Sequence, residues 1–148
     1  MSNDLLSLLH DLARHSRMEA DRRASAQGLT LAQWKILIHL ERQAGLSQKE
    51  LAEILEVEPI TIARLIDRLE AHGLVQRRDD PADRRIWRLH LTPGAEPVLK
   101  ALAQERVAML EAITEGLARA EIATVEAAME RMKANVVAGL RARGAEAA

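Results

Sequence analysis

The sequence predicts a mostly α-helical fold with one small β-hairpin. Most of the 148 residues lie in tracts whose apolar side chains recur every three or four positions, as they do on one face of an α-helix. Only residues 74–92 change to an alternation of apolar and polar side chains around turn-forming residues, which is the pattern of two antiparallel strands. The composition, with 48% hydrophobic and 29% charged residues, is typical of an ordered globular domain.

The first two helices are predicted from their apolar spacing and their end signals. The first covers residues 4–26 and ends before Gly28, because glycine favours the left-handed conformation that follows a helix. Thr30 and Gln33 then have the spacing of a capping box, in which each side chain bonds the backbone N–H of the other. This box begins a second helix that ends near Gly45.

A second capping box, Ser47 with Glu50, begins a third helix of about two turns. Three residues separate it from Pro59, which suits the first position of a fourth helix, and Gly73 ends that helix. The fourth helix has a regular buried stripe, made of Ile62, Leu65, Ile66 and Leu69.

The hairpin and two long helices complete the chain. Residues 74–76 are a short strand, residues 79–83 are turn-forming, and residues 87–91 alternate as a second strand. A helical tract follows, with Gly94 and Pro97 making its first turn irregular, so that regular helix is expected from Pro97. Gly116 divides this tract into two helices; the second is expected to end at Arg143, with residues 144–148 frayed.

Several classes of protein are excluded or disfavoured by composition. The absence of cysteine excludes disulfides, thiolate metal sites and a cysteine nucleophile. The sequence contains no apolar run long enough to cross a membrane, and its first 17 residues lack the apolar centre of a signal peptide, so we expect a cytoplasmic protein. No catalytic motif, metal-binding spacing or cofactor motif is present, which predicts no catalytic residues, no metal and no cofactor.

The order of a short helix, a three-residue turn, another helix and a hairpin is typical of a winged helix-turn-helix. The apolar stripe of the fourth helix leaves Thr61, Arg64 and Arg68 on an outward stripe that can enter a major groove. Both arginines can donate bidentately to guanine edges or phosphates, and Thr61 can reach a phosphate or a thymine methyl. The alternative interpretation is a solvated helix face.

The hairpin brings together five arginines, two of them at its tip in the run Asp83-Arg84-Arg85. An arginine on a narrow loop can insert into a minor groove. We expect Asp83 to pair with one neighbouring arginine and orient it, while the other contacts DNA. Residues 59–92 carry a net charge of +2 although the whole chain is net −1, so positive charge is concentrated in this segment.

Residues 28–96 closely resemble the multiple-antibiotic-resistance regulator (MarR) family, and Gly116-Leu117 with the helical run 129–135 extends the resemblance to nearly the whole chain. The resemblance rests on four runs: Gln48-Lys49-Glu50-Leu51-Ala52, Arg64-Leu65-Ile66-Asp67-Arg68-Leu69-Glu70, Gly73-Leu74-Val75, and Asp83-Arg84-Arg85 through Leu91-Thr92. It implies a homodimeric winged-helix transcription regulator, usually a repressor, that binds near-palindromic DNA and responds to a small molecule. It also implies DNA contacts from Pro59, Thr61, Arg64, Arg68 and Arg85, with Asp83 and Arg84 as supporting neighbours.

The same resemblance implies the domain organisation. Residues 1–148 form a single domain, in which residues 30–92 are the DNA-binding lobe and residues 4–26 and 97–143 supply dimerisation helices. The apolar stripes on these flanking helices are too extensive for a monomer of this size to bury, which also predicts a homodimer.

The resemblance also implies an effector site between the flanking helices and the winged lobe. His10, Arg14 and Arg17 share one face of the first helix, and Trp34 and His39 lie on the next helix. Such a set suits a small anionic aromatic ligand, because guanidinium binds carboxylate and indole stacks on a ring. The alternative interpretation places both arginines in solvent or in pairs with Asp11 and Asp21, and Trp34 in the core.

Two other functions remain open from sequence alone. The chain can be a helical interaction module that uses its wing to bind protein rather than DNA, or a hydrolase without a recognisable motif. Only the DNA-binding regulator predicts an affinity for DNA that falls steeply with salt, because phosphate contacts release counterions.

Overall fold

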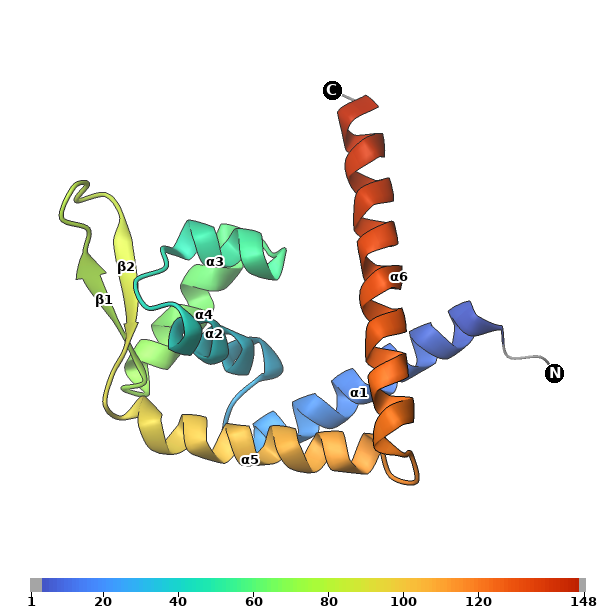
Figure 1. Ribbon diagram of the computed structural model, residues 1–148. Helices are drawn as coiled ribbons and strands as arrows, with labels where there is room; N and C mark the ends of the chain where they lie inside the picture. The colour runs from blue at the N-terminus through green and yellow to red at the C-terminus, as the bar shows by residue number, and fades with distance from the viewer. Residues whose placement is uncertain (1–3, 147–148) are drawn as a thin grey trace. The chain divides into compact units, whose positions relative to one another are not determined.

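The computed structural model describes residues 4–146 and contains six helices and one two-stranded antiparallel sheet in this range (Figure 1). The elements in order are α1 Leu5–Ala26, α2 Leu31–Arg42, α3 Gln48–Leu55, α4 Pro59–Ala71, β1 Val75–Asp79, β2 Trp87–Leu91, α5 Ala95–Ile113 and α6 Arg119–Glu146. The predicted fold class, mostly helical with a hairpin wing, is therefore confirmed. None of the helices in residues 4–146 combines the length and the apolar character needed to cross a lipid bilayer.

The chain divides into two compact units, one that extends to Met109 and one that begins at Leu110. The first unit contains α1 to α4, the hairpin and most of α5. The second contains the end of α5 and all of α6.

The core of the first unit lies among α2, α3, α4 and the hairpin, and α5 adds Leu102 to it. Its largest fully buried side chains are Ile36, Leu37, Leu40, Leu51, Ile62, Ile66, Leu69, Val75, Leu89 and Leu102. Burying an aliphatic side chain of this size contributes about 1.5–3 kcal/mol, so this cluster is the main source of the unit's stability. It holds α3 and α4 against each other and fixes which face of α4 points outward.

Both predicted capping boxes are present. The Thr30 hydroxyl accepts from the Gln33 N–H at 3.2 Å, and the Gln33 side chain accepts from the Thr30 N–H at 2.9 Å. Ser47 and Glu50 form the same pair of bonds at 3.1 and 2.7 Å. At the other end of α3, Glu56 adopts the left-handed conformation at φ 54° and turns the chain toward α4.

The hairpin forms as predicted, but its first strand is shifted and longer. It begins at Val75 rather than Leu74 and continues to Asp79, which pairs with Trp87 and was expected in the turn. The strand extends to Asp79 because the loop at the tip begins at Asp80, whose carboxylate closes it. On its other edge, β2 bonds the loop before α3, where the Leu89 N–H donates to the Leu46 carbonyl at 3.0 Å.

The predicted start of α5 was wrong by two residues, because the helix begins at Ala95 and not at Pro97. Pro97 is the third residue of the helix, where a missing N–H removes no intrahelical bond. The Ala95 N–H donates to the Thr92 carbonyl at 3.0 Å, and the Thr92 hydroxyl donates to the Gly73 carbonyl. These bonds connect the end of the hairpin to the start of α5.

In the second unit, Gly116 lies at φ 81° and separates the two long helices as predicted. At the start of α6 the Glu121 carboxylate accepts from the Ala118 N–H at 2.7 Å, which is one half of a capping box. The expected end at Arg143 was wrong, because α6 continues through Gly144 to Glu146. A glycine lowers helix propensity without ending a helix, and the predicted fraying of residues 147–148 lies outside the described residues.

Candidate nucleic-acid interface

Helix α4 has one fully buried face and one free face. Ile62, Ile66 and Leu69 have no exposed surface, and they fix the inward direction of the helix. Arg64 and Arg68 lie on the opposite side and are exposed, and neither forms an ion pair with any residue in the 4–146 range. The guanidinium groups of this face are therefore free to bind another molecule.

The other two residues predicted on α4 lie nearer its beginning. Pro59 is its exposed first residue. Thr61 is also exposed, but it lies toward the edge of the outward face, where it lines a cavity of about 210 Å³ with Leu31 and Lys35 of α2. The structure thus brings the four predicted α4 residues to one exposed region, with Arg64 more central than Thr61.

The tip of the hairpin is organised by two aspartates. The Asp80 carboxylate accepts from the N–H groups of Ala82 and Asp83, at 2.7 and 3.0 Å, and so closes the loop. The Asp83 carboxylate accepts from the Arg85 side chain at 3.0 and 2.9 Å and from the Arg85 N–H at 3.0 Å. These bonds lower the pKa of Asp83, with the Arg85 side chain as the largest cause.

The expected pairing of Asp83 with a neighbouring arginine therefore involves Arg85, whose side chain nevertheless remains 90% exposed. Arg84 is also exposed and forms no ion pair within the described part of the chain. The arginine that Asp83 orients is the one to which the family resemblance assigns the minor groove.

Arg77 of β1 is an internal anchor. Its guanidinium donates to Asp67 and Glu70 of α4, both at 2.6 Å, and to the Gln48 side chain of α3 at 3.0 Å. It also reaches the Ala63 carbonyl at 3.4 Å, and its side chain is only 17% exposed. One arginine thus connects the first strand of the wing to both helices of the helix-turn-helix.

Arg88 of β2 is a second anchor. It donates to Asp80 at 2.6 Å and to Glu50 at the start of α3 at 3.0 Å. The bond from Arg88 is the largest cause of a lowered pKa at Asp80. Because Asp80 also closes the loop, this contact connects the conformation of the hairpin tip to α3.

The five arginines of the hairpin therefore divide into two groups that the sequence analysis did not separate. Arg77 and Arg88 hold the wing, whereas Arg78, Arg84 and Arg85 are exposed. A local signal was available for Arg77, because it lies two residues after buried Val75 in a strand and so shares its face. No local signal predicts the contact of Arg88 with a residue 38 positions earlier.

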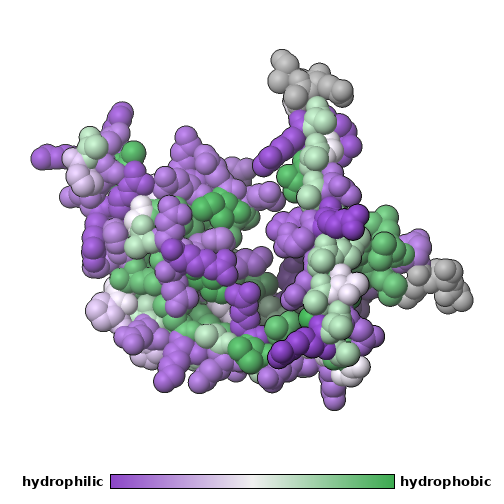
Figure 2. Space-filling model, in the orientation of Figure 1, coloured by the Kyte–Doolittle hydropathy of each residue, from purple (hydrophilic) through white to green (hydrophobic). Residues whose placement is uncertain are grey.

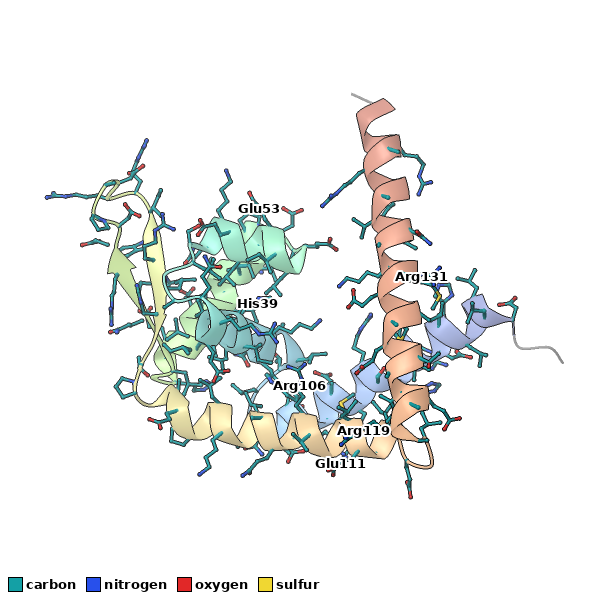
Figure 3. The ribbon with its side chains drawn as sticks, viewed as in Figure 1. His39, Glu53, Arg106, Glu111, Arg119 and Arg131 are labelled. Atoms are coloured by element: carbon teal, nitrogen blue, oxygen red, sulfur yellow. The ribbon has the colours of Figure 1, made fainter. Side chains whose placement is uncertain are left out.

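The residues predicted for an effector site are not brought together. His10, Arg14 and Arg17 are exposed on α1, and Arg14 pairs with Asp11 at 3.0 Å. His39 is half-buried on α2 (Figure 3).

Trp34 is 5% exposed and belongs to the core, but it also lines a cavity of about 90 Å³ between α2 and α5. The cations around that cavity are Arg42 and Arg106, not Arg14 and Arg17. The Trp34 indole N–H has no hydrogen-bond partner among the described residues.

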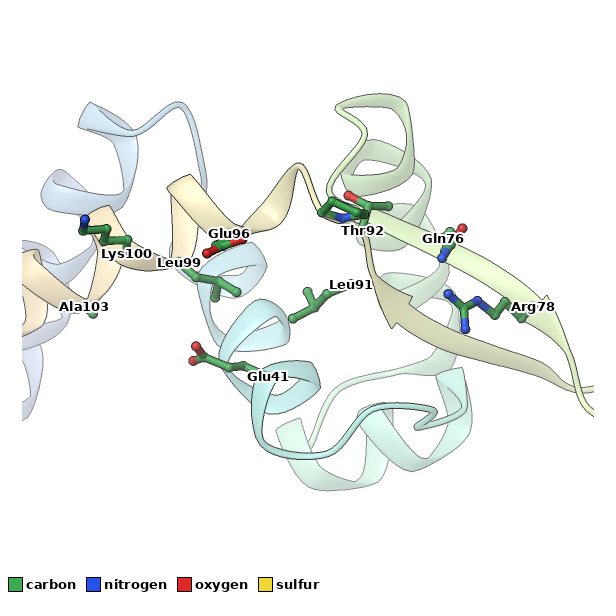
Figure 4. A pocket seen from close by; sticks show the side chains of 10 residues that line it. Glu41, Gln76, Arg78, Leu91, Thr92, Glu96, Leu99, Lys100 and Ala103 are labelled. Carbon is green, nitrogen blue, oxygen red and sulfur yellow. The ribbon is translucent and has the colours of Figure 1, made fainter.

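A larger and more open cleft of about 560 Å³ lies between α2, α5 and the base of the hairpin (Figure 4). It shares Glu41, Leu99 and Ala103 with the Trp34 cavity, so the two spaces adjoin. Arg78 and Lys100 also line it. Among residues 4–146, no three histidine, aspartate or glutamate side chains are grouped as a metal site requires.

Comparison with known proteins finds transcriptional regulators both by sequence and by fold. The family model described as the MarR family matches residues 29–87, which contain the helix-turn-helix and β1. The uncharacterized HTH-type transcriptional regulator YybA of Bacillus subtilis (strain 168) is 28% identical over 134 residues, 90% of this chain and 89% of that protein.

Two solved structures extend the similarity to most of the fold. A crystal structure of MarR aligns with a TM-score of 0.77 at 28% identity and covers 90% of this chain and 97% of its own. A mutant MarR from E. coli complexed with operator DNA aligns with a TM-score of 0.76 at 26% identity, covering 86% of this chain and 92% of its own. Residues 29–87 therefore match the MarR family of transcriptional regulators, and the fold resembles that of MarR over most of the chain.

Proposed function

We propose that this regulator is a cytoplasmic repressor that binds a near-palindromic operator as a homodimer. Arg64 and Arg68 of α4 contact base edges in the major groove. Pro59 and Thr61 lie along the DNA backbone. Arg85, oriented by Asp83, enters the neighbouring minor groove, and Arg84 contacts phosphate. The observation that carries this proposal is the division between exposed arginines that pair with no helix residue in the 4–146 range and the two arginines that hold the wing.

Both DNA-contacting elements are held by one structural unit, which supports their acting together. Arg77 and Arg88 fix the hairpin to α3 and α4, so the outward face of α4 and the tip of the wing keep a constant spacing. A rigid arrangement loses little conformational entropy on binding. The MarR structure with operator DNA supports the same use of this fold.

The test is to select bound duplexes from a randomised library and to measure the affinity of the best duplex across a salt series. We expect an inverted repeat with half-sites about 10 bp apart and an affinity that falls steeply with salt. Arg64→Ala should weaken binding by about 1–3 kcal/mol and relax the preference at one position of each half-site. Arg131→Ala, an exposed arginine of α6, is the control and should leave affinity unchanged. Unchanged binding by Arg64→Ala would refute the base-reading role.

The homodimer is proposed from apolar side chains that neither unit buries. On α1, Leu5, Leu6, Leu8 and Met18 are 48–62% exposed. On α6, Val136 and Leu140 are 62% and 58% exposed, and apolar surface runs along this helix in Figure 2. A second copy of the chain would remove this surface from water.

Sedimentation velocity tests the dimer. The wild type should sediment at twice 16.4 kDa, and the double variant Val136→Asp, Leu140→Asp should sediment as a monomer. Asn135→Asp adds charge at an exposed polar position of the same helix and should remain dimeric. A wild type that is monomeric at micromolar concentration would refute the proposal.

For the effector we propose an anionic aromatic molecule that enters the cleft and reaches Trp34. An acceptor on such a ligand would satisfy the buried indole N–H, and Arg42 and Arg106 would pair with its carboxylate. His10, Arg14, Arg17 and His39 have no place in this cavity, so Trp34 is the one predicted effector residue that we retain.

The probe for this site is benzoate, with the fluorescence of Trp34 as the readout. Trp87→Phe leaves Trp34 as the single tryptophan, since the chain has two. Saturable quenching that is weakened by Arg106→Ala is the expected result. Quenching that is absent or unaffected by Arg106→Ala would refute this site while leaving the DNA-binding proposal intact.

A further inference from the structure

Ile60 is an exposed apolar residue at the start of α4, and its role goes beyond the DNA contacts proposed above, on which this inference rests. Within residues 30–92, all of which are described, the large apolar side chains that remain exposed are Ile54, Val57, Ile60 and Trp87. Ile60 is the most exposed of them, at 61%. The core leaves this isoleucine out although it buries Ile62, two positions later.

The direction of Ile60 follows from the geometry of the helix. Successive residues turn by about 100°, so residues four apart lie nearly one above the other. Ile60 therefore lies one turn before Arg64, on the side away from Ile62, Ile66 and Leu69. Thr61 lies about 100° further round, toward the cavity beside α2. Ile60 and Arg64 thus form the centre of the outward face, with Thr61 at its edge.

We propose that Ile60 recognises the 5-methyl group of a thymine in the major groove, beside the base that Arg64 contacts. The thymine methyl is the apolar group that the four bases present on the major-groove edge, and an aliphatic side chain is its natural partner. Contact removes both from water, which accounts for an isoleucine where the free protein gains nothing by having one.

The spacing of the two residues gives the position of the thymine. Four residues of helix rise about 6 Å, and base pairs follow each other at about 3.4 Å along the duplex. With α4 lying along the groove, Ile60 and Arg64 reach positions one or two base pairs apart. The operator should therefore contain, in each half-site, a thymine within two base pairs of the base specified by Arg64.

The experiment removes the methyl group from the DNA instead of altering the protein. The probe is the duplex that the wild-type protein selects from a randomised library, with each thymine replaced in turn by deoxyuridine, which keeps the base pair. We expect one thymine per half-site at which this replacement weakens wild-type binding, by about fourfold for one buried methyl. Ile60→Ala should bind the unmodified duplex more weakly and show no further loss at that position.

Two further protein variants serve as controls for this experiment. Ile54→Ala removes another exposed isoleucine of the helix-turn-helix and should keep the full sensitivity to deoxyuridine. Ile60→Val keeps a branched aliphatic side chain and should keep most of the sensitivity to deoxyuridine.

The outcomes separate this inference from the proposed function. If every deoxyuridine duplex binds like its parent, or if Ile60→Ala shows the same loss as the wild type, methyl recognition by Ile60 is wrong and the operator-binding proposal stands. If the wild type selects no duplex, the operator-binding proposal fails, and this inference fails with it.

Discussion

Helices α4 and α6 show how differently one chain treats its apolar side chains. Of the 13 residues of α4, Ile62, Ile66 and Leu69 are completely buried by their own chain. Of residues 119–144 of the longer α6, none is buried, although Val136 and Leu140 are large and apolar. The winged lobe is therefore complete within a single chain, whereas α6 presents the kind of surface that a partner covers. Stability therefore depends mainly on the first region, and the association that we propose depends on the second.

The largest effect should come from truncating the core of the lobe. Leu51→Ala removes a side chain with no exposed surface and should lower the free energy of unfolding by about 2–5 kcal/mol in a urea titration. The same truncation at Leu140, 58% exposed, should act on the monomer–dimer equilibrium, measured by sedimentation. Lys49→Ala, at an exposed position of α3, is the control and should stay within about 0.5 kcal/mol of wild type. A Leu51→Ala protein as stable as this control would end the distinction between the two regions.

The second prediction concerns the anchors within the lobe. Arg77→Ala leaves Asp67, Glu70 and Gln48 without their partner and should lower the free energy of unfolding by about 1–2 kcal/mol, because the carboxylates keep contact with water. Arg78→Ala, at the exposed neighbouring position, should change it by less than about 0.5 kcal/mol.

Operator affinity gives a second test of the anchor at Arg77. Arg77→Ala should lower operator affinity although Arg77 is not exposed to DNA, since it positions the hairpin. Equal stability of the two variants would show that Arg77 does not hold the wing.

A smaller effect is expected at the start of α6, where the capping box is half complete. Ala118→Ser supplies the missing hydroxyl acceptor and should stabilise this helix end by about 0.5–1 kcal/mol. Hydrogen exchange at the amides of residues 119–122 measures it, with slower exchange expected. Glu121→Ala removes the half that exists and should speed exchange of the Ala118 amide. Exchange unchanged in both variants would contradict this assignment of the cap.

The smallest effect is confined to acid and concerns α1. The Arg22 and Arg23 side chains bond Glu19 and lower its pKa from 4.5 to about 2. Because the folded pKa is the lower one, the stabilisation is present above about pH 4.5 and is lost as the pH falls toward 2. Glu19→Gln should therefore lose less stability than wild type over this interval, measured by urea titrations from pH 5 downward.

The control for this pH dependence is Glu53→Gln, an exposed carboxylate on α3. Its free energy of unfolding should fall with decreasing pH as that of the wild type does. If Glu19→Gln also does so, the bonds to Arg22 and Arg23 contribute nothing to folding.

The sequence predicts the elements well because their signals are local. Both capping boxes, the proline at the start of α4 and the glycine before α6 act within a few residues, and the structure contains all of them. The errors at Pro97 and Gly144 have a common cause, since each residue was read as a breaker where its position in the helix makes it tolerable.

The roles of the site residues are harder to predict from sequence, because they depend on contacts between residues far apart in the chain. The outward direction of Arg64 follows from helical spacing, but the anchoring of Arg88 depends on a contact with Glu50 across the fold. The sequence suggests roles for the two arginines at the tip of the hairpin, but only the observed partners show that Arg77 and Arg88 hold the wing. The residues predicted for the effector site are separated for the same reason, since Trp34 lines a cavity with residues of α5 and not with the charged residues of α1.

The division between holding and reading arginines has a consequence for how such a regulator diversifies. Asp67, Glu70 and Arg77 hold β1 to α4, while residues 60, 64 and 68 form no ion pair within the described part of the chain. Under the proposed function, copies of the gene can change residues 60, 64 and 68 and so acquire new target sites while the fold is kept. A library randomised at those three positions, with the ion-paired residues kept, should be rich in folded proteins of altered sequence preference.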